Sequence, residues 1–133
     1  MRSALEEILR LSKSRNCRTV LTTFALGYPP EDIRLQQAIM ANESKMLHFW
    51  GRIESTVLGV RAHNGLMREL AKKHGVTLID NTNLLPRDSA YFIDICHFTH
   101  LGVSKLAQHI AKGIVDSKMI DGLFESHSGL RNH

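Results

Sequence analysis

The chain has 133 residues, of which 43% are hydrophobic and 23% charged, and its formal net charge is +4. These values are typical of one globular domain and argue against a disordered chain. The lysines and arginines are scattered along the sequence and only 6% of the residues are aromatic. We therefore expect no nucleic-acid binding, which favours massed positive charge and stacking rings.

No apolar run is long enough to span a bilayer, so we expect no membrane span. The N-terminal segment carries acidic residues among its apolar ones, unlike a signal peptide. Cys17 and Cys96 lie far apart in the sequence and belong to no regular cysteine framework. This usage favours a reducing compartment, and in the absence of a targeting signal we assign the cytoplasm only by default.

The first predicted elements are a helix and a strand. Ser3 and Glu6 fit a capping box at the start of a helix that continues to about Ser14. Residues 18–24 are β-branched and apolar and predict a buried strand. Gly27 and the two prolines after it end that strand.

Residues 31–53 predict a helical insert, in one piece or two. Its apolar side chains suggest an amphipathic cover or lid, or equally a surface that packs against another part of the protein or another chain. They are Ile33, Leu35, Ile39, Met40, Met46, Leu47, Phe49 and Trp50.

The second half of the chain repeats the order helix, strand, helix. Ser55 is a candidate N-cap for the next helix, and Gly75 is a C-cap signal at its end. The predicted elements after it are a strand at 76–80, a polar loop at 81–91, a helix at 100–115 and a flexible tail at 121–133. The inward-facing residues expected in the last helix are Leu101, Leu106, Ile110 and Ile114.

Alternation of strand and helix predicts the α/β class with a parallel sheet. Only two strands are visible, whereas parallel sheets have covered faces and more strands than that. The sequence therefore predicts an incomplete sheet.

The stretch YFIDICHFTHLG, residues 91–102, concentrates the chemistry of the chain. Asp94 and His97 are spaced so that both side chains reach one side of a tight turn. A histidine held by a carboxylate accepts a proton from a nucleophile and returns it to a leaving group. We therefore predict Asp94 and His97 as a catalytic acid–base pair, against the simpler reading of a capping carboxylate beside a structural histidine.

This stretch resembles the last block of the SGNH (GDSL-type) hydrolases, which is D-x-x-H, an apolar residue, a glycine and a helix with L-A-x-x-I. The matching residues are Asp94, His97, Phe98, Gly102, Leu106, Ala107 and Ile110. Residues 64–71 and 75–80 resemble the family's penultimate helix and strand, and residues 18–30 resemble the strand and loop before them.

The resemblance implies a flavodoxin-like three-layer α/β/α sandwich and a serine hydrolase that acts on a small-molecule ester or acylated substrate. It implies that His97 is the base, that Asp94 orients it, and that no metal or cofactor takes part. The family's G-D-S and G-x-N-D blocks are absent from this sequence. Residues 1–120 therefore correspond to the C-terminal part of such a domain, and we expect the chain alone to be inactive.

Two arrangements remain open for the absent half. It is either a missing N-terminal part, or the chain forms a homodimer that rebuilds the sheet. The alternative class is a non-catalytic remnant or interaction protein that assembles with another chain.

Other chemistry in the same block is less well supported. Asp94, Cys96, His97 and His100 are of types that ligate zinc, but neighbouring side chains such as Cys96 and His97 tend to point apart, so we predict no metal. Cys96 is a candidate thiol nucleophile, though such a residue is more often a small buried hydrophobe. The candidate replacement nucleophiles lie in no strand-to-helix elbow; they are Ser44, Ser55, Ser89 and Ser104.

Overall fold

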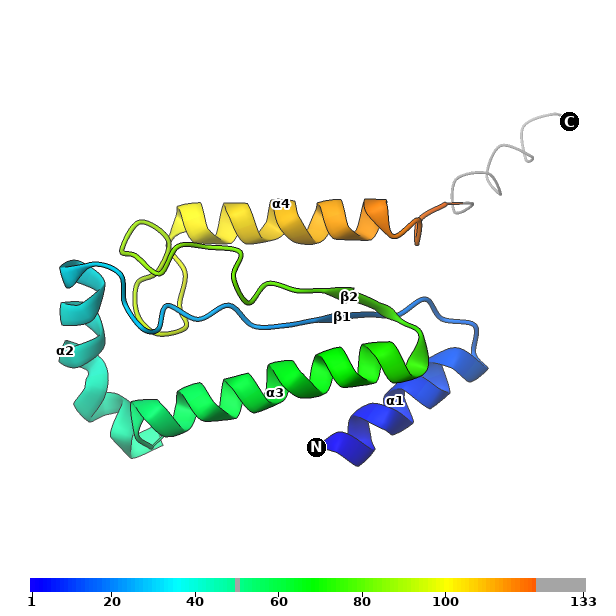
Figure 1. Ribbon diagram of the computed structural model, residues 1–133, viewed down its shortest axis with the longest axis horizontal. Helices are drawn as coiled ribbons and strands as arrows, with labels where there is room; N and C mark the ends of the chain where they lie inside the picture. The colour runs from blue at the N-terminus through cyan, green and yellow to red at the C-terminus, as the bar shows by residue number, and fades with distance from the viewer. Residues whose placement is uncertain (50, 122–133) are drawn as a thin grey trace, which may run out of the picture.

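The computed structural model describes residues 1–49 and 51–121, with side chains for all of these except residues 44–49. Four helices and two strands follow one another in the described chain (Figure 1). They are α1 (Arg2–Ser14), β1 (Val20–Thr22), α2 (Ile33–Phe49), α3 (Ile53–His74), β2 (Thr77–Ile79) and α4 (His100–Asp116).

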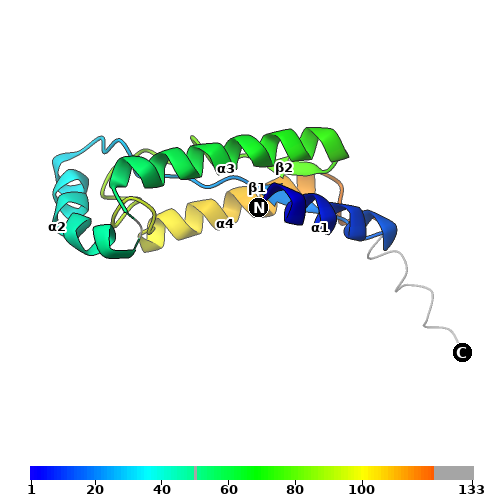
Figure 2. The same ribbon diagram turned by 90° about the horizontal axis from the view of Figure 1, so that it is seen from below.

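β1 and β2 form a parallel pair in which Val20 lies opposite Thr77 and Thr22 opposite Ile79. α3 connects the two strands and runs along one side of the pair, while α4 runs along the other side (Figures 1 and 2). α1 packs against α3, and α2 lies across one end of the molecule (Figure 1). The predicted α/β class with parallel strands is confirmed.

β1 is shorter than the strand predicted at residues 18–24 because side chains take the backbone groups of Thr23 and Phe24: Nδ2 of Asn81 donates to the carbonyl of Thr23 on the β2 side, and Asn64 bonds Phe24. The amide of Asn64 on α3 accepts from the N–H of Phe24 and donates to its carbonyl, both at 2.8 Å. The N–H of Thr23 donates to Ile79 at 3.2 Å. Since backbone groups alternate in direction along a strand, those of Thr22 face the opposite edge, where the described chain has no further strand.

Two apolar clusters make up the core. One joins α2 and α3 to the loops after both strands, and it consists of Ala25, Leu35, Ile39, Ile53, Val57, Leu85, Phe92 and Ile95. The other joins α1 to α3 and consists of Leu9, Leu66, Met67 and Leu70. Both clusters lie on the side of the strands that α3 covers or at the end near α2.

α4 contributes little to this core, because its side of the strand pair has no second described helix. Gly102 is its only buried residue, and Leu106, Ile110 and Ile114 are half-buried. The prediction that Leu101 faces inward is wrong, since this side chain is 44% exposed.

The helix ends test three predicted caps. Gly75 ends α3 with φ of 64°, the left-handed conformation that glycine adopts without strain, as predicted. Ser3 and Ser55 are wrong as N-caps because both lie inside the first turns of their helices. α1 already starts where the N–H of Leu5 donates to the carbonyl of Met1, and α3 starts where the N–H of Thr56 donates to the carbonyl of Arg52 at 3.1 Å.

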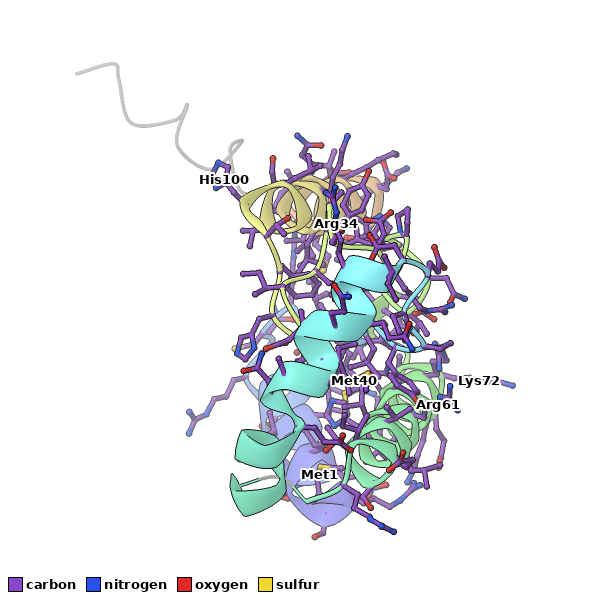
Figure 3. The ribbon with its side chains drawn as sticks, turned by 90° about the vertical axis from the view of Figure 1, so that its left-hand side faces the viewer. Met1, Arg34, Met40, Arg61, Lys72 and His100 are labelled. Carbon is purple, nitrogen blue, oxygen red and sulfur yellow. The ribbon has the colours of Figure 1, made fainter. Side chains whose placement is uncertain are left out.

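α2 packs one face on the rest of the molecule. Leu35 and Ile39 are buried, whereas Met40 is 64% exposed and, like Arg34, projects away from the body (Figure 3). The side chains of Met46, Leu47, Phe49 and Trp50, on which the predicted lid also depends, lie outside the described residues, as does the predicted tail beyond Asp121. None of the described helices has the length and apolar character needed to cross a bilayer.

Candidate functional site

The site lies on the loop between β2 and α4, beyond the carboxyl ends of the two strands. Phe92 and Phe98 pair as an antiparallel bridge, and the N–H of Ile93 donates to the carbonyl of His97 at 2.8 Å. The N–H of Gly27 in the loop after β1 donates to the carbonyl of Ile95 at 2.9 Å. Because Phe92 and Ile95 are fully buried, the loop is held at several points and presents residues 94–97 in one conformation.

The turn at Asp94 brings the predicted pair together. One carboxylate oxygen of Asp94, Oδ1, accepts from the backbone N–H of Cys96 at 2.9 Å and of His97 at 2.8 Å. The other, Oδ2, lies 2.7 Å from Nδ1 of His97. An ionised carboxylate only accepts hydrogen bonds, so Nδ1 carries the proton and Nε2 is left as the base.

Asp94 and His97 differ in burial and in charge. The Asp94 side chain is 16% exposed and the His97 side chain 73% exposed. Burial alone raises the pKa of Asp94, but the hydrogen bonds from the N–H groups of Cys96 and His97 and from the His97 ring outweigh it, and the net pKa lies below its usual value. Asp94 is therefore a fixed anion at neutral pH, and the reactive ring edge faces solvent.

A mainly apolar cavity of about 370 Å³ adjoins this pair. One wall is the loop after β1, with Phe24, Ala25 and Leu26, and another is α3, with Thr56 and Val60. The loop of residues 94–98 closes it. Its size and apolar lining suit an acyl chain held against a polar reacting group.

A second cavity, of about 400 Å³, lies at the other end of the strands. Lys13, Cys17, Arg18 and His74 are among its lining residues, and the Nε2 atom of His74 has no hydrogen-bond partner in the described chain. The C-terminal ends of α1 and α3 meet here, and the lining contains no carboxylate to orient a histidine. It therefore lacks the acid–base arrangement that the first cavity has.

Asp80 anchors the carboxyl ends of the strands beside the site. Arg68 donates to it through Nε at 2.7 Å, and Thr23 and the N–H of Thr82 donate to Oδ1 at 2.7 and 3.0 Å. The Arg68 guanidinium is the main reason that the pKa of this carboxyl lies far below its usual range. Asn81, which is buried, donates from Nδ2 to the carbonyl of Thr23 at 2.8 Å.

Sequence reasoning missed the roles of Asn64 and Asn81. Each is a buried asparagine whose amide holds backbone groups of the chain at the end of β1. An asparagine on the buried face of a helix, or directly after a strand, is the sequence signal for such a clamp, because a buried amide requires hydrogen-bond partners.

Cys96 departs from both readings given to it. It is exposed rather than buried, and its Sγ lies 3.8 Å from Nδ1 of His97, so the two neighbours do not point apart. The reason is the turn at Asp94, which gathers both backbone N–H groups onto one carboxylate oxygen. Partial burial of the thiol in the cavity wall, together with the charge of Asp94, raises the pKa of Cys96, which disfavours a thiolate nucleophile at neutral pH.

None of the candidate serines whose side chains are described lines the cavity at Asp94. The hydroxyl of Ser89 donates to Asp32 at 2.5 Å, and Ser55 and Ser104 are exposed on helices. The side chain of Ser44 lies outside the described residues. Thr99 caps α4, because its hydroxyl accepts from the N–H of Gly102 at 3.1 Å.

The chain matches no model of a protein family and no curated protein. The geometry of Asp94 and His97 and the sequence block around them are therefore the features of the described chain that bear on its function.

Proposed function

We propose that this chain is the Asp–His end of an SGNH (GDSL-type) esterase or acyl hydrolase with a flavodoxin-like three-layer sandwich. The observation that carries the proposal is the 2.7 Å contact between Oδ2 of Asp94 and Nδ1 of His97 beside an apolar cavity of about 370 Å³. A buried anion, an exposed imidazole edge and an acyl-sized cavity are the parts that ester hydrolysis requires on the base side.

In this mechanism His97 moves the proton and Asp94 holds the ring. Nε2 of His97 takes the proton of a serine hydroxyl as its oxygen attacks the ester carbonyl, and then gives that proton to the departing alcohol. A water molecule releases the acyl group by the same exchange in reverse. Asp94 stabilises the imidazolium formed in both steps, and Phe24, Ala25 and Leu26 surround the acyl chain of the small-molecule substrate.

The serine is supplied by a polypeptide segment outside these 133 residues, because G-D-S occurs nowhere in them. The uncovered edge of β1 supports this proposal. The backbone N–H and carbonyl of Thr22 point toward this edge, and further strands of a parallel sheet add at such an edge. The shallow packing of α4, whose Val103 and Val115 are more than half exposed, supports it too.

The same two surfaces favour a second candidate function, in which the chain is a non-catalytic remnant or interaction protein that assembles with another chain. This second function would require neither the cavity nor the contact between Asp94 and His97. Activity distinguishes the two candidates, because assembly without a serine gives no ester hydrolysis.

The test compares three polypeptides in buffer with a metal chelator, using p-nitrophenyl acetate as substrate. We expect residues 1–133 to hydrolyse it no faster than an Asp94→Asn, His97→Ala double variant. We expect the polypeptide translated from the reading frame continuing upstream of Met1 to contain G-D-S and to hydrolyse the ester. Turnover by residues 1–133 that the double variant loses would contradict the proposed role of an external serine.

A further inference from the structure

Three potential metal ligands meet on the loop before α4. One carboxylate oxygen of Asp94, Sγ of Cys96 and one ring nitrogen of His97 all lie within 4.8 Å of one another. Nδ1 of His97 is 2.7 Å from the carboxylate oxygen and 3.8 Å from the sulfur. We propose that these three side chains form a binding site for one borderline transition-metal ion such as Zn²⁺.

The donor set selects the class of ion. A thiolate, an imidazole and a carboxylate together suit Zn²⁺ or Co²⁺, whereas Mg²⁺ and Ca²⁺ take oxygen ligands. From usual zinc bond lengths, ligand atoms around a tetrahedral ion are roughly 3.3–3.6 Å apart. The separation of Asp94 and His97 is somewhat shorter and that of Cys96 and His97 somewhat longer, and small side-chain rotations bring both into range.

The backbone prepares the site for a metal ion. The N–H groups of Cys96 and His97 occupy Oδ1 of Asp94 and leave Oδ2 to face the imidazole. The ion takes the place of the proton between Oδ2 and Nδ1, the neutral His97 ring then carries its one proton on Nε2, and Cys96 gives up its thiol proton to solvent on binding. The bridge between Phe92 and Phe98 fixes the loop, so that little ordering is left for the ion to impose.

The cavity leaves room for a fourth ligand. Asp94, Cys96 and His97 all line the space of about 370 Å³ beside Phe24 and Val60. Three protein ligands with one open position is the coordination of zinc sites that exchange water or a small molecule. The structure thus points to a site with an exchangeable ligand rather than a closed structural one.

Binding of the ion competes with the acid–base pair. The ion occupies the same Nδ1 and Oδ2 atoms that hold His97 to Asp94, so zinc inhibits any hydrolysis that uses this pair. That consequence depends on the proposed function, whereas the binding site itself does not.

The experiment measures binding without an activity assay. Metal-free, reduced residues 1–133 are titrated with Zn²⁺ by calorimetry and with Co²⁺ by near-ultraviolet absorption, where a thiolate ligand gives a charge-transfer band. We expect one ion per chain and a cobalt–thiolate band. Cys96→Ser should remove the band and weaken zinc binding at least about tenfold, since losing even an outer-shell partner costs about 10–100-fold.

Cys17→Ser is the matched control, because Cys17 is the other exposed free cysteine and lines the cavity at the opposite end. It should keep both the stoichiometry and the band. Circular dichroism of each variant shows whether it is folded. Equal zinc affinity of Cys96→Ser and the unmodified chain would overturn the site, as would loss of the band in Cys17→Ser or binding of half an ion per chain.

Discussion

Asp80 is the carboxylate that the fold holds most firmly in its ionised form, through Arg68, Thr82 and Thr23. Its pKa is far below the value of about 3.9 expected in the unfolded chain. A depressed pKa contributes stability that is complete above the unfolded pKa and is lost as the pH falls toward the folded one. The contribution of Asp80 is therefore full at neutral pH and declines on acidification below about pH 5.

Asp80→Asn should lower the free energy of unfolding at neutral pH by about 1–2 kcal/mol, allowing for solvent screening of a partly exposed pair. The gap between the variant and the unmodified chain should narrow as the pH falls from about 5 to about 2. Urea unfolding followed by circular dichroism at several pH values measures both curves. Parallel curves over this range would mean that the charge of Asp80 contributes nothing.

At the residue scale, the spacing in the sequence predicted that Asp94 and His97 lie together. It did not predict that the side chain of Cys96 points toward the same ring. The D-x-x-H spacing is enough to bring Asp94 and His97 together, because one carboxylate accepts both backbone N–H groups of the turn. The direction of Cys96 depends on backbone angles within that turn, which spacing alone does not specify. The clamps formed by Asn64 and Asn81 depend on tertiary contacts for the same reason.

At the scale of the elements, Gly102 determines how closely α4 packs against the loop that carries the site. It lies in the first turn of α4, and a Cβ atom there would overlap the carbonyl oxygen of Tyr91 at the start of the site loop. This close approach lets the helix begin directly behind residues 91–98. A larger residue must move either α4 or the loop.

We expect Gly102→Ala to lower the free energy of unfolding by roughly 1–3 kcal/mol through overpacking. Gly65→Ala in α3 is the matched control, because no atom lies within 4 Å of its added Cβ. It should raise stability by about 0.5–1 kcal/mol, as alanine favours a helix over glycine. Urea unfolding of both variants tests this, and equal effects of the two substitutions would contradict the packing argument.

The elements themselves were predictable where local chemistry defines them. Periodicity predicted the extent of α4 to within one residue, and Gly75 predicted the end of α3, whereas α3 starts three residues before the position that a cap at Ser55 implies. The extent of β1 was not predictable, because pairing with β2 ends where the side chain of Asn81 takes the carbonyl of Thr23. Leu101 was misplaced because periodicity identifies an apolar face without saying whether a neighbour covers it.

At the scale of the whole molecule, two surfaces are uncovered in the described chain. One is the free edge of β1 at Thr22. The other is α4, which exposes the apolar side chains of Leu101, Val103 and Val115. Free edges and exposed apolar patches promote association, so we expect residues 1–133 to form dimers or larger species.

Size-exclusion chromatography with light scattering measures this association at several concentrations. Thr22→Pro removes the outward N–H of β1 while sparing the groups that pair with β2, and should shift the chain toward monomer. Thr22→Val keeps that N–H and is the control that should associate normally. A stable monomer of the unmodified chain would argue against an incomplete sheet.

The central claim is that Asp94 and His97 are the acid–base end of a serine hydrolase. The measurement that tests it most directly is the kcat for p-nitrophenyl acetate of the polypeptide extended upstream of Met1, with and without His97→Ala. We predict a fall on the order of 10³-fold or more, as expected for loss of the base in such a triad. An unchanged kcat in the variant, or a locus with no upstream frame encoding G-D-S, would contradict the account.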